Sequence, residues 1–337
     1  MKTIGRSARG KRTAVSNSRK SKLRKYTVTA TVFLTLVAVF AVAYYNIPAL
    51  HQKDINGTVL KGILDENVVL PQAQGALKVS QGDVYVFDIY VEYKDKNGNT
   101  AAGEISDKSE LNMDFSNTSV CDRTAYNTIQ FKSNAPNGTI LRVTLEYEGQ
   151  KQTFQFIIAA ALDSTVGADG VLTNPSDSAV LVTSTRNLPS DYVPKGMTQP
   201  NVQFKSGVGD AQKYLCSEAA IAAEKMFTTA KNDGMILTAL KGFSGYSASD
   251  PEHQTGLALD VSSVSVDYSV TSKLAGSVQG QWLAENAYKF GFVLRYPSGK
   301  EGVTGFAYSP AHLRYVGVEL ATYLYENNLT LDELYAR

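Results

Sequence analysis

The sequence is poor in the side chains that most often carry metals and redox chemistry. Its 337 residues include three histidines, two cysteines and one tryptophan. A secreted disulfide framework would need more cysteines at closer spacing than Cys121 and Cys216. We therefore expect both thiols to be reduced or buried, and neither to be a catalytic nucleophile or a metal ligand. With histidine so scarce, the positions of His253 and His312 become informative.

Acidic residues are missing from positions 1–25, which hold ten of the 33 Lys and Arg residues. Residues 26–45 carry no charge and match the length of a membrane-spanning helix. A cleaved signal peptide, with a weak site at 41–43, is the alternative, but its apolar core would be shorter. Because basic flanks stay in the cytoplasm, we predict a single-pass cell-membrane protein with everything after about residue 46 outside.

The formal net charge of +1 conceals an acidic remainder. Without the basic tail, 23 Lys and Arg face 32 Asp and Glu, a charge of −9. Proteins that bind nucleic acid show a basic face, so this balance argues against nucleic acid as a partner. Beside a membrane span, the basic tail is better explained by topology and contact with anionic lipid.

Residues 58–160 show a strand pattern. Residues 83–93 alternate polar and apolar side chains, and residues 139–158 predict a hairpin turning at Glu148 and Gly149. Several short strands separated by turn signals over about 100 residues predict an immunoglobulin-like β-sandwich. No cluster of acids or histidines marks a site there, so we expect a spacer or a protein-binding module.

Composition changes again after this region. Residues 161–180 are rich in Gly, Ser, Asp and Asn, which is typical of a linker. Residues 181–337 then show both helical and strand periodicity in their apolar residues. This combination predicts an α+β domain with a small antiparallel sheet. Helices are expected at 211–232 and 279–290, strands at 235–243, 256–264 and 292–296, and a strand passing into a helix at 313–327.

His253, Asp260 and His312 are the candidate metal ligands. Two neutral imidazoles and one carboxylate suit Zn²⁺ and leave a fourth position for water or substrate. A strand beginning at Gly256 lets Asp260 point back toward a histidine in the preceding turn, while His312 arrives from a neighbouring strand. The alternative is that both histidines are hydrogen-bonded structural residues.

Three sequence blocks carry a family resemblance, and they occur in the family's order. They are His253-Gln-Thr-Gly-Leu-Ala-Leu-Asp260, then Trp282-Leu-x-x-Asn-Ala-x-x-Phe-Gly-Phe-x-Leu-Arg-Tyr-Pro297, and His312-Leu-Arg-Tyr-Val-Gly317. Together they resemble the VanY-type D-alanyl-D-alanine carboxypeptidases, zinc metallopeptidases of the bacterial cell wall. The resemblance covers roughly residues 181–337 and implies that His253, Asp260 and His312 hold Zn²⁺.

Two positions depart from the family pattern. The family's Glu-Pro-Trp-His reads Ser309-Pro-Ala-His312 here, so a serine stands where the general base is expected. The loss of a positioned base costs about 10²–10⁴-fold in rate. The family's substrate-binding Arg is replaced by Ser247. Candidate substitutes are Glu252 and Glu301 for the base, and Arg295 and Arg314 for the substrate carboxylate, although exposed acids and structural salt bridges are the ordinary roles of such residues.

The sequence thus leaves competing functions open. The first is a membrane-anchored zinc D,D-carboxypeptidase that trims the stem peptides of peptidoglycan. The second is a degenerate relative that binds wall peptide or a protein partner without cleavage. A purely structural role would leave the retained ligands unexplained. Ligand retention favours the first, and the replaced Glu and Arg favour the second.

Overall fold

The computed structural model describes residues 66–69, 75–95, 97–105, 107–159, 165–247 and 250–336. The predicted basic tail (1–25), membrane span (26–45) and connector (46–57) lie outside these residues. Within the described residues, every helix is too short or too polar to cross a bilayer. The described residues divide into two compact units: the first draws on those within 66–69, 88–111 and 147–150, and the second on those within 75–87, 112–146 and 151–336.

Ten strands lie within residues 58–160, the region in which alternating polar and apolar residues predicted β-structure. They are β1 (Glu66–Val69), β2 (Ala76–Val79), β3 (Val84–Val86), β4 (Tyr90–Lys94), β5 (Thr100–Gly103), β6 (Asn112–Phe115), β7 (Cys121–Ala125), β8 (Thr128–Phe131), β9 (Ile140–Tyr147) and β10 (Gln150–Ile158). The first unit holds the sheet β1-β4-β5, and the second holds β2-β10-β9-β6 and β3-β8-β7. The predicted hairpin is confirmed as β9 and β10, with positive φ at Glu148 and Gly149 as a tight two-residue turn requires.

The single strand expected over 83–93 is wrong. Residues 87–89 lie outside strand pairing, so β3 joins β8 while β4 joins β1 and β5. Phe87 and Ile89 at the break are both buried. The sequence cannot reveal this break, because polar and apolar side chains alternate through it without interruption. Only the strand partner of the backbone changes, from β8 for β3 to β1 and β5 for β4.

The remaining elements belong to the second unit. They are β11 (Met197–Thr198), η3 (Asp210–Lys213), β12 (Leu215–Cys216), α2 (Ser217–Asn232), β13 (Thr238–Lys241), η4 (Glu252–Thr255), β14 (Ala258–Ser262), η5 (Val264–Val266), α3 (Ser272–Ala275), α4 (Val278–Asn286), η6 (Ala287–Phe290), β15 (Phe292–Tyr296), α5 (Glu301–Thr304), β16 (Ser309–Tyr315), α6 (Val318–Glu326) and α7 (Leu331–Ala336). The η labels mark 3₁₀ helices.

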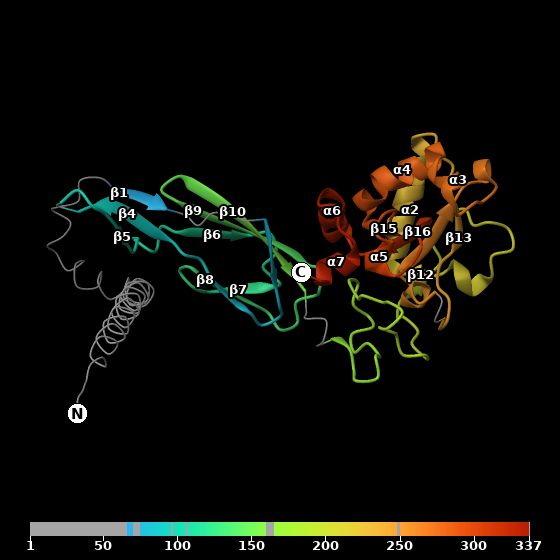
Figure 1. Cartoon of the computed structure of the whole chain (residues 1–337), viewed down its shortest axis with the longest axis horizontal. Helices are drawn as coiled ribbons and strands as arrows, with labels where there is room; N and C mark the ends of the chain where they lie inside the picture. The colour runs from blue at the N-terminus through green and yellow to red at the C-terminus, as the bar shows by residue number, and fades with distance from the viewer. Residues whose placement is uncertain are drawn as a thin grey trace, which may run out of the picture. The chain divides into compact units, whose positions relative to one another are not determined.

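A small antiparallel sheet of order β13-β14-β16-β15 is the centre of this region, which confirms the predicted sheet. Helices α2 and α4 lie beside it (Figure 1). Their apolar faces form one core with the strands, in which Met226 and Leu283 pack with Leu259 and Leu313. The predicted stop after residue 232 is also confirmed, since α2 ends at Asn232 and Gly234 follows with φ 80°.

A second apolar cluster joins β9 and β10 to α6 and α7 within the same unit. It includes Ile140 and Ile157 from the strands, with Leu320 and Leu334 from the helices. Ala179 also belongs to this cluster, although composition predicted a linker at 161–180. The end of that segment is therefore part of the folded core.

Candidate metal centre

The central sheet sets three polar side chains in one row. Asp260 of β14 pairs with Lys241 of β13 on one side and with His312 of β16 on the other. Residues directly opposite each other in antiparallel strands project to the same face. The strand register alone therefore brings a carboxylate, an ammonium and an imidazole together.

His253 reaches this row from outside the sheet. It lies in the 3₁₀ turn η4, which ends at Gly256 with φ 68°. A side chain at position 256 would be strained at that angle, and its Cβ would lie only 3.0 Å from Cys216 Sγ. Gly256 thus lets the chain turn sharply from η4 into β14, which sets His253 above Asp260.

Asp260 lies between the two histidines. Its Oδ1 is 2.8 Å from His312 Nδ1, and its Oδ2 is 3.3 Å from His253 Nε2. The imidazole rings meet edge to face, with centroids 4.9 Å apart. On the other side of His312, the ring of Tyr296 stacks at 5.1 Å and fixes the plane of the imidazole. The residues predicted as ligands are therefore brought together.

The unused nitrogens of these histidines fit a metal. His253 Nδ1 donates to the Gly242 carbonyl at 2.5 Å, so Nε2 carries the lone pair. His253 Nε2 and His312 Nε2 are buried and lack hydrogen-bond partners among the described residues. Burial opposes the charge of Asp260, yet its contacts with His253 and His312 hold the pKa of its carboxyl below the usual range. A half-buried carboxylate beside two buried imidazoles that lack full hydrogen bonding is a suitable ligand set for a divalent cation.

Sequence reasoning missed one acid at this site. Asp250 Oδ2 is 3.8 Å from His253 Nε2 and forms an ion pair with Lys241 Nζ. Asp250, His253 and His312 can each offer a ligand atom within 4.8 Å of the others. The position of Asp250, three residues before His253, was the available signal, but a loop residue's direction does not follow from its spacing.

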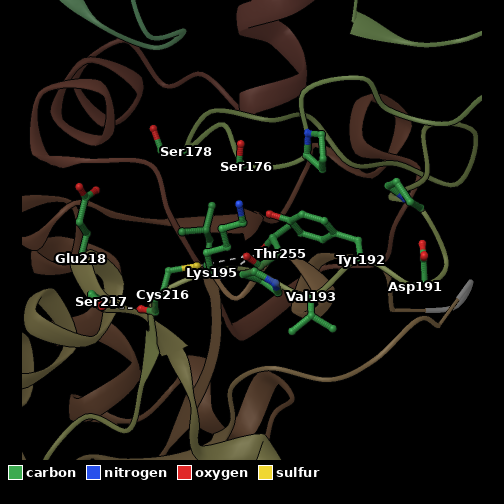
Figure 2. Close-up of a pocket in the computed structure, with 15 residues that line it drawn as sticks. Ser176, Ser178, Asp191, Tyr192, Val193, Lys195, Cys216, Ser217, Glu218 and Thr255 are labelled. Carbon is green, nitrogen blue, oxygen red and sulfur yellow. Dashed lines mark hydrogen bonds between the residues drawn. The ribbon is translucent and has the colours of Figure 1, made fainter.

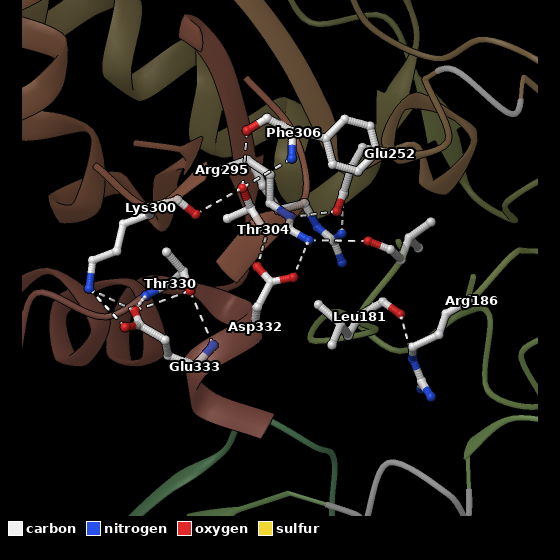
Figure 3. Close-up of polar contacts among 12 residues, drawn as sticks. Leu181, Arg186, Glu252, Arg295, Lys300, Thr304, Phe306, Thr330, Asp332 and Glu333 are labelled. Carbon is white, nitrogen blue, oxygen red and sulfur yellow. Dashed lines mark hydrogen bonds and ion pairs between the residues drawn. The ribbon is translucent and has the colours of Figure 1, made fainter. Parts of the chain in front are cut away.

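Glu252, predicted as a substitute base, is fully buried and belongs to an ion cluster (Figure 3). Arg295 Nε donates to its Oε1 at 2.6 Å, and Arg314 Nη1 donates to its Oε2. Arg295 also pairs with Asp332 of α7. Burial disfavours the charge of Glu252, but Arg314 and Arg295 outweigh it and lower the pKa of Glu252 to about 2. With both oxygens occupied, Glu252 is a structural residue and cannot serve as the base.

The substrate-binding candidates need the same correction. Arg295 and Arg314 are buried, and beyond Glu252 they donate to backbone carbonyls at Val182 and Val180 respectively. Neither guanidinium is therefore available to a substrate carboxylate. Glu301 is exposed at the start of α5, where it accepts from Gly299 N at 3.3 Å, and its role as a base stays a prediction. Ser309 begins β16.

A separate cavity of about 760 Å³ lies at the beginning of α2 (Figure 2). Cys216 and Thr255 line it, while the histidines of the candidate metal centre do not. Cys216 Sγ donates to the Thr255 carbonyl at 3.5 Å, and burial raises the pKa of its thiol. Burial also raises the pKa of Cys121, to about 11. Both cysteines are free, as predicted, and both are poor nucleophiles.

Comparison with known proteins agrees with this geometry. The family model described as VanY, D-alanyl-D-alanine carboxypeptidase, matches residues 245–318, which include all the candidate ligands. The putative carboxypeptidase YodJ of Bacillus subtilis (strain 168) is 34% identical over 195 residues, which cover 50% of this chain and 71% of YodJ. The chain belongs to the VanY family.

Other VanY relatives match shorter stretches. A D-alanyl-D-alanine carboxypeptidase of Enterococcus faecium is 44% identical over 90 residues, which cover 27% of this chain and 26% of the relative. Among solved structures, the LdcB LD-carboxypeptidase is 35% identical, covers 49% of this chain and 89% of its own, and superposes with a TM-score of 0.47.

Proposed function

We propose that this chain is a zinc carboxypeptidase-like protein of the bacterial cell wall that takes the D-Ala-D-Ala end of peptidoglycan stem peptides. The observation that carries the proposal is the convergence of His253, Asp260 and His312, which the sheet register and the η4 turn bring within hydrogen-bonding range of one another. Relatives named as D-alanyl-D-alanine carboxypeptidases support the substrate class.

In this proposal, His253, Asp260 and His312 hold Zn²⁺. Such an ion polarises a peptide carbonyl and lowers the pKa of bound water to about 7. The chain's own contribution is orientation: Gly242 fixes the His253 tautomer, and Tyr296 fixes the plane of the His312 ring. Burial raises the pKa of the Tyr296 hydroxyl, so this group stays protonated and can donate a hydrogen bond.

The second candidate is a relative that binds wall peptide or a protein partner without cleaving. Two observations favour it. A serine hydroxyl at position 309 cannot take up a proton near neutral pH as a general base must, and Glu252 is occupied by Arg295 and Arg314. The two candidates share the metal and differ only in whether a base stands near the bound water.

The rest of the chain suits a surface role. We propose a membrane anchor at 26–45, with the tail of 1–25 in the cytoplasm, on charge and hydropathy. We also propose an immunoglobulin-like arrangement for 58–160 that acts as a spacer or a binding module. The separate, mainly antiparallel sheets β2-β10-β9-β6 and β3-β8-β7 support that proposal.

The test uses the full chain, with metal analysis followed by incubation with a pentapeptide ending in D-Ala-D-Ala. We expect one zinc per chain, lost in His253→Ala, and mass spectrometry should show release of a single D-Ala. Release by Ser309→Glu but not by the natural chain would establish the non-cleaving candidate. Ser309→Gln has a similar size without a base and serves as the control. A metal-free natural chain would overturn both candidates.

A further inference from the structure

Asp250 lies close to the two histidines of the candidate metal centre. It precedes the turn η4, whereas Asp260 and His312 project from the sheet. Its Oδ2 is 3.8 Å from His253 Nε2, and its ligand atom lies within 4.8 Å of those of His253 and His312. A shift of about 1 Å would bring these atoms to the spacing that metal–ligand bonds of 2.0–2.2 Å allow.

The surroundings of Asp250 also point to a ligand. His253 Nε2 and His312 Nε2 are buried without hydrogen-bond partners among the described residues, and the two side chains are exposed to only 0% and 7%. A buried polar atom without a partner is costly, and a bound cation is one of the explanations that such an atom calls for. The side chain of Asp250 is 33% exposed and can therefore move.

We propose that Asp250 is a fourth protein ligand of the metal, beside His253, Asp260 and His312. This inference rests on the metal binding proposed above. Two imidazoles and two carboxylates complete a tetrahedral site and neutralise a divalent cation. Catalytic zinc sites keep three protein ligands and one water, while sites with four protein ligands are structural. While it is bound to the metal, Asp250 occupies the position that water or a peptide carbonyl would take, so the proposed cleavage requires Asp250 to leave the metal.

Lys241 gives Asp250 a second partner. Its Nζ pairs with Asp250 Oδ2, and Lys241 lies opposite Asp260 in the sheet register. The ammonium and the metal therefore compete for the same carboxylate. When Asp250 turns to Lys241, a coordination position opens, and when it turns to the metal, the position closes.

The experiment compares metal binding in the full natural chain and in Asp250→Ala. Zinc affinity is measured by competition with a chelator, and Co²⁺ is substituted so that azide entering an open position changes the visible spectrum. We expect Asp250→Ala to weaken zinc binding by at least about tenfold, because even partners outside the coordination shell change affinity by 10–100-fold. Azide should alter the Co²⁺ spectrum of Asp250→Ala at a lower concentration than it alters the spectrum of the natural chain.

Asp210→Ala is the matched control, because it removes an exposed aspartate that also pairs with a lysine, Lys213. It should behave as the natural chain in both measurements. Circular dichroism checks folding, and Asp250→Asn, which preserves side-chain size, replaces the alanine variant if that variant unfolds. Equal zinc affinity and equal azide response in the natural chain and the variant would overturn this inference alone. Absence of zinc from the natural chain would overturn the proposed function with it.

Discussion

Glu252 shows how far the role of one residue depends on its surroundings. It stands next to the proposed metal ligand His253 in sequence, which made it a reasonable candidate for the general base. In the structure its carboxylate is held by Arg295 and Arg314, both fully buried. Removing one partner of such a buried pair leaves an uncompensated charge. Glu252 therefore holds the turn that carries His253, and its contribution is to stability.

Glu252→Gln should lower the free energy of unfolding by about 3–5 kcal/mol. The effect depends on pH, because the pKa of Glu252 falls from its ordinary 4.5 to about 2 in the folded chain. Its stabilisation is fully present above pH 4.5 and is lost as the pH falls through about 2. Urea unfolding at a series of pH values would show a smaller decline over this window in the variant. Glu301→Gln, which changes an exposed acid, should leave the decline intact.

At the scale of elements, α7 illustrates a helix that tertiary contacts make possible. Its six residues, Leu331–Ala336, are too few to form a stable helix alone. Leu334 and Tyr335 join the apolar cluster with β9 and β10, and the Tyr335 hydroxyl donates to the Ala179 carbonyl at 2.6 Å. Asp332 pairs with Arg295, which links α7 through Glu252 to the turn η4.

Asp332→Asn should therefore destabilise the fold by about 3 kcal/mol, because it leaves the buried cluster with an excess positive charge. Thermal unfolding followed by circular dichroism measures the change. Glu319→Gln in α6 is a suitable control, since it breaks only an exposed pair with Arg142 at 3.7 Å and should cost less than about 1 kcal/mol. Equal losses in the two variants would contradict the role assigned to the cluster.

For the whole molecule, metal binding and folding are linked. The candidate ligands come from η4, β14 and β16, so an ion bound to all three favours the folded chain over the unfolded one. The sheet that holds them packs on α2 and α4 through a single apolar core. Loss of the metal should therefore lower the free energy of unfolding of the whole chain as well as disturb the site.

Treatment with a chelator should lower the unfolding midpoint of the zinc-loaded chain, and added zinc should restore it. The expected loss is about 4 kcal/mol when free zinc stands at 1,000 times its dissociation constant. Differential scanning calorimetry measures the shift. His253→Ala, which lacks a ligand, should show a much smaller response to the chelator. A large response in that variant would place the stabilising metal elsewhere.

The sequence by itself determined the central sheet, the end of α2 and the candidate ligands. Apolar periodicity and Gly234 predicted the sheet and the end of α2, and the resemblance to the VanY family predicted that His253, Asp260 and His312 meet. Such features depend on neighbours in the chain, so they can be read from it. The same resemblance predicted that Ser309 stands at the family's general-base position.

Only the tertiary structure decided the direction of Glu252 and the approach of Asp250. Both residues lie in the stretch before β14, where no repeating pattern fixes which way a side chain points. Their partners, Arg314 for Glu252 and Lys241 for Asp250, come from other strands of the sheet. Contacts between segments far apart in sequence set these positions, because ion pairing in a buried site depends on distance in space and not on spacing along the chain.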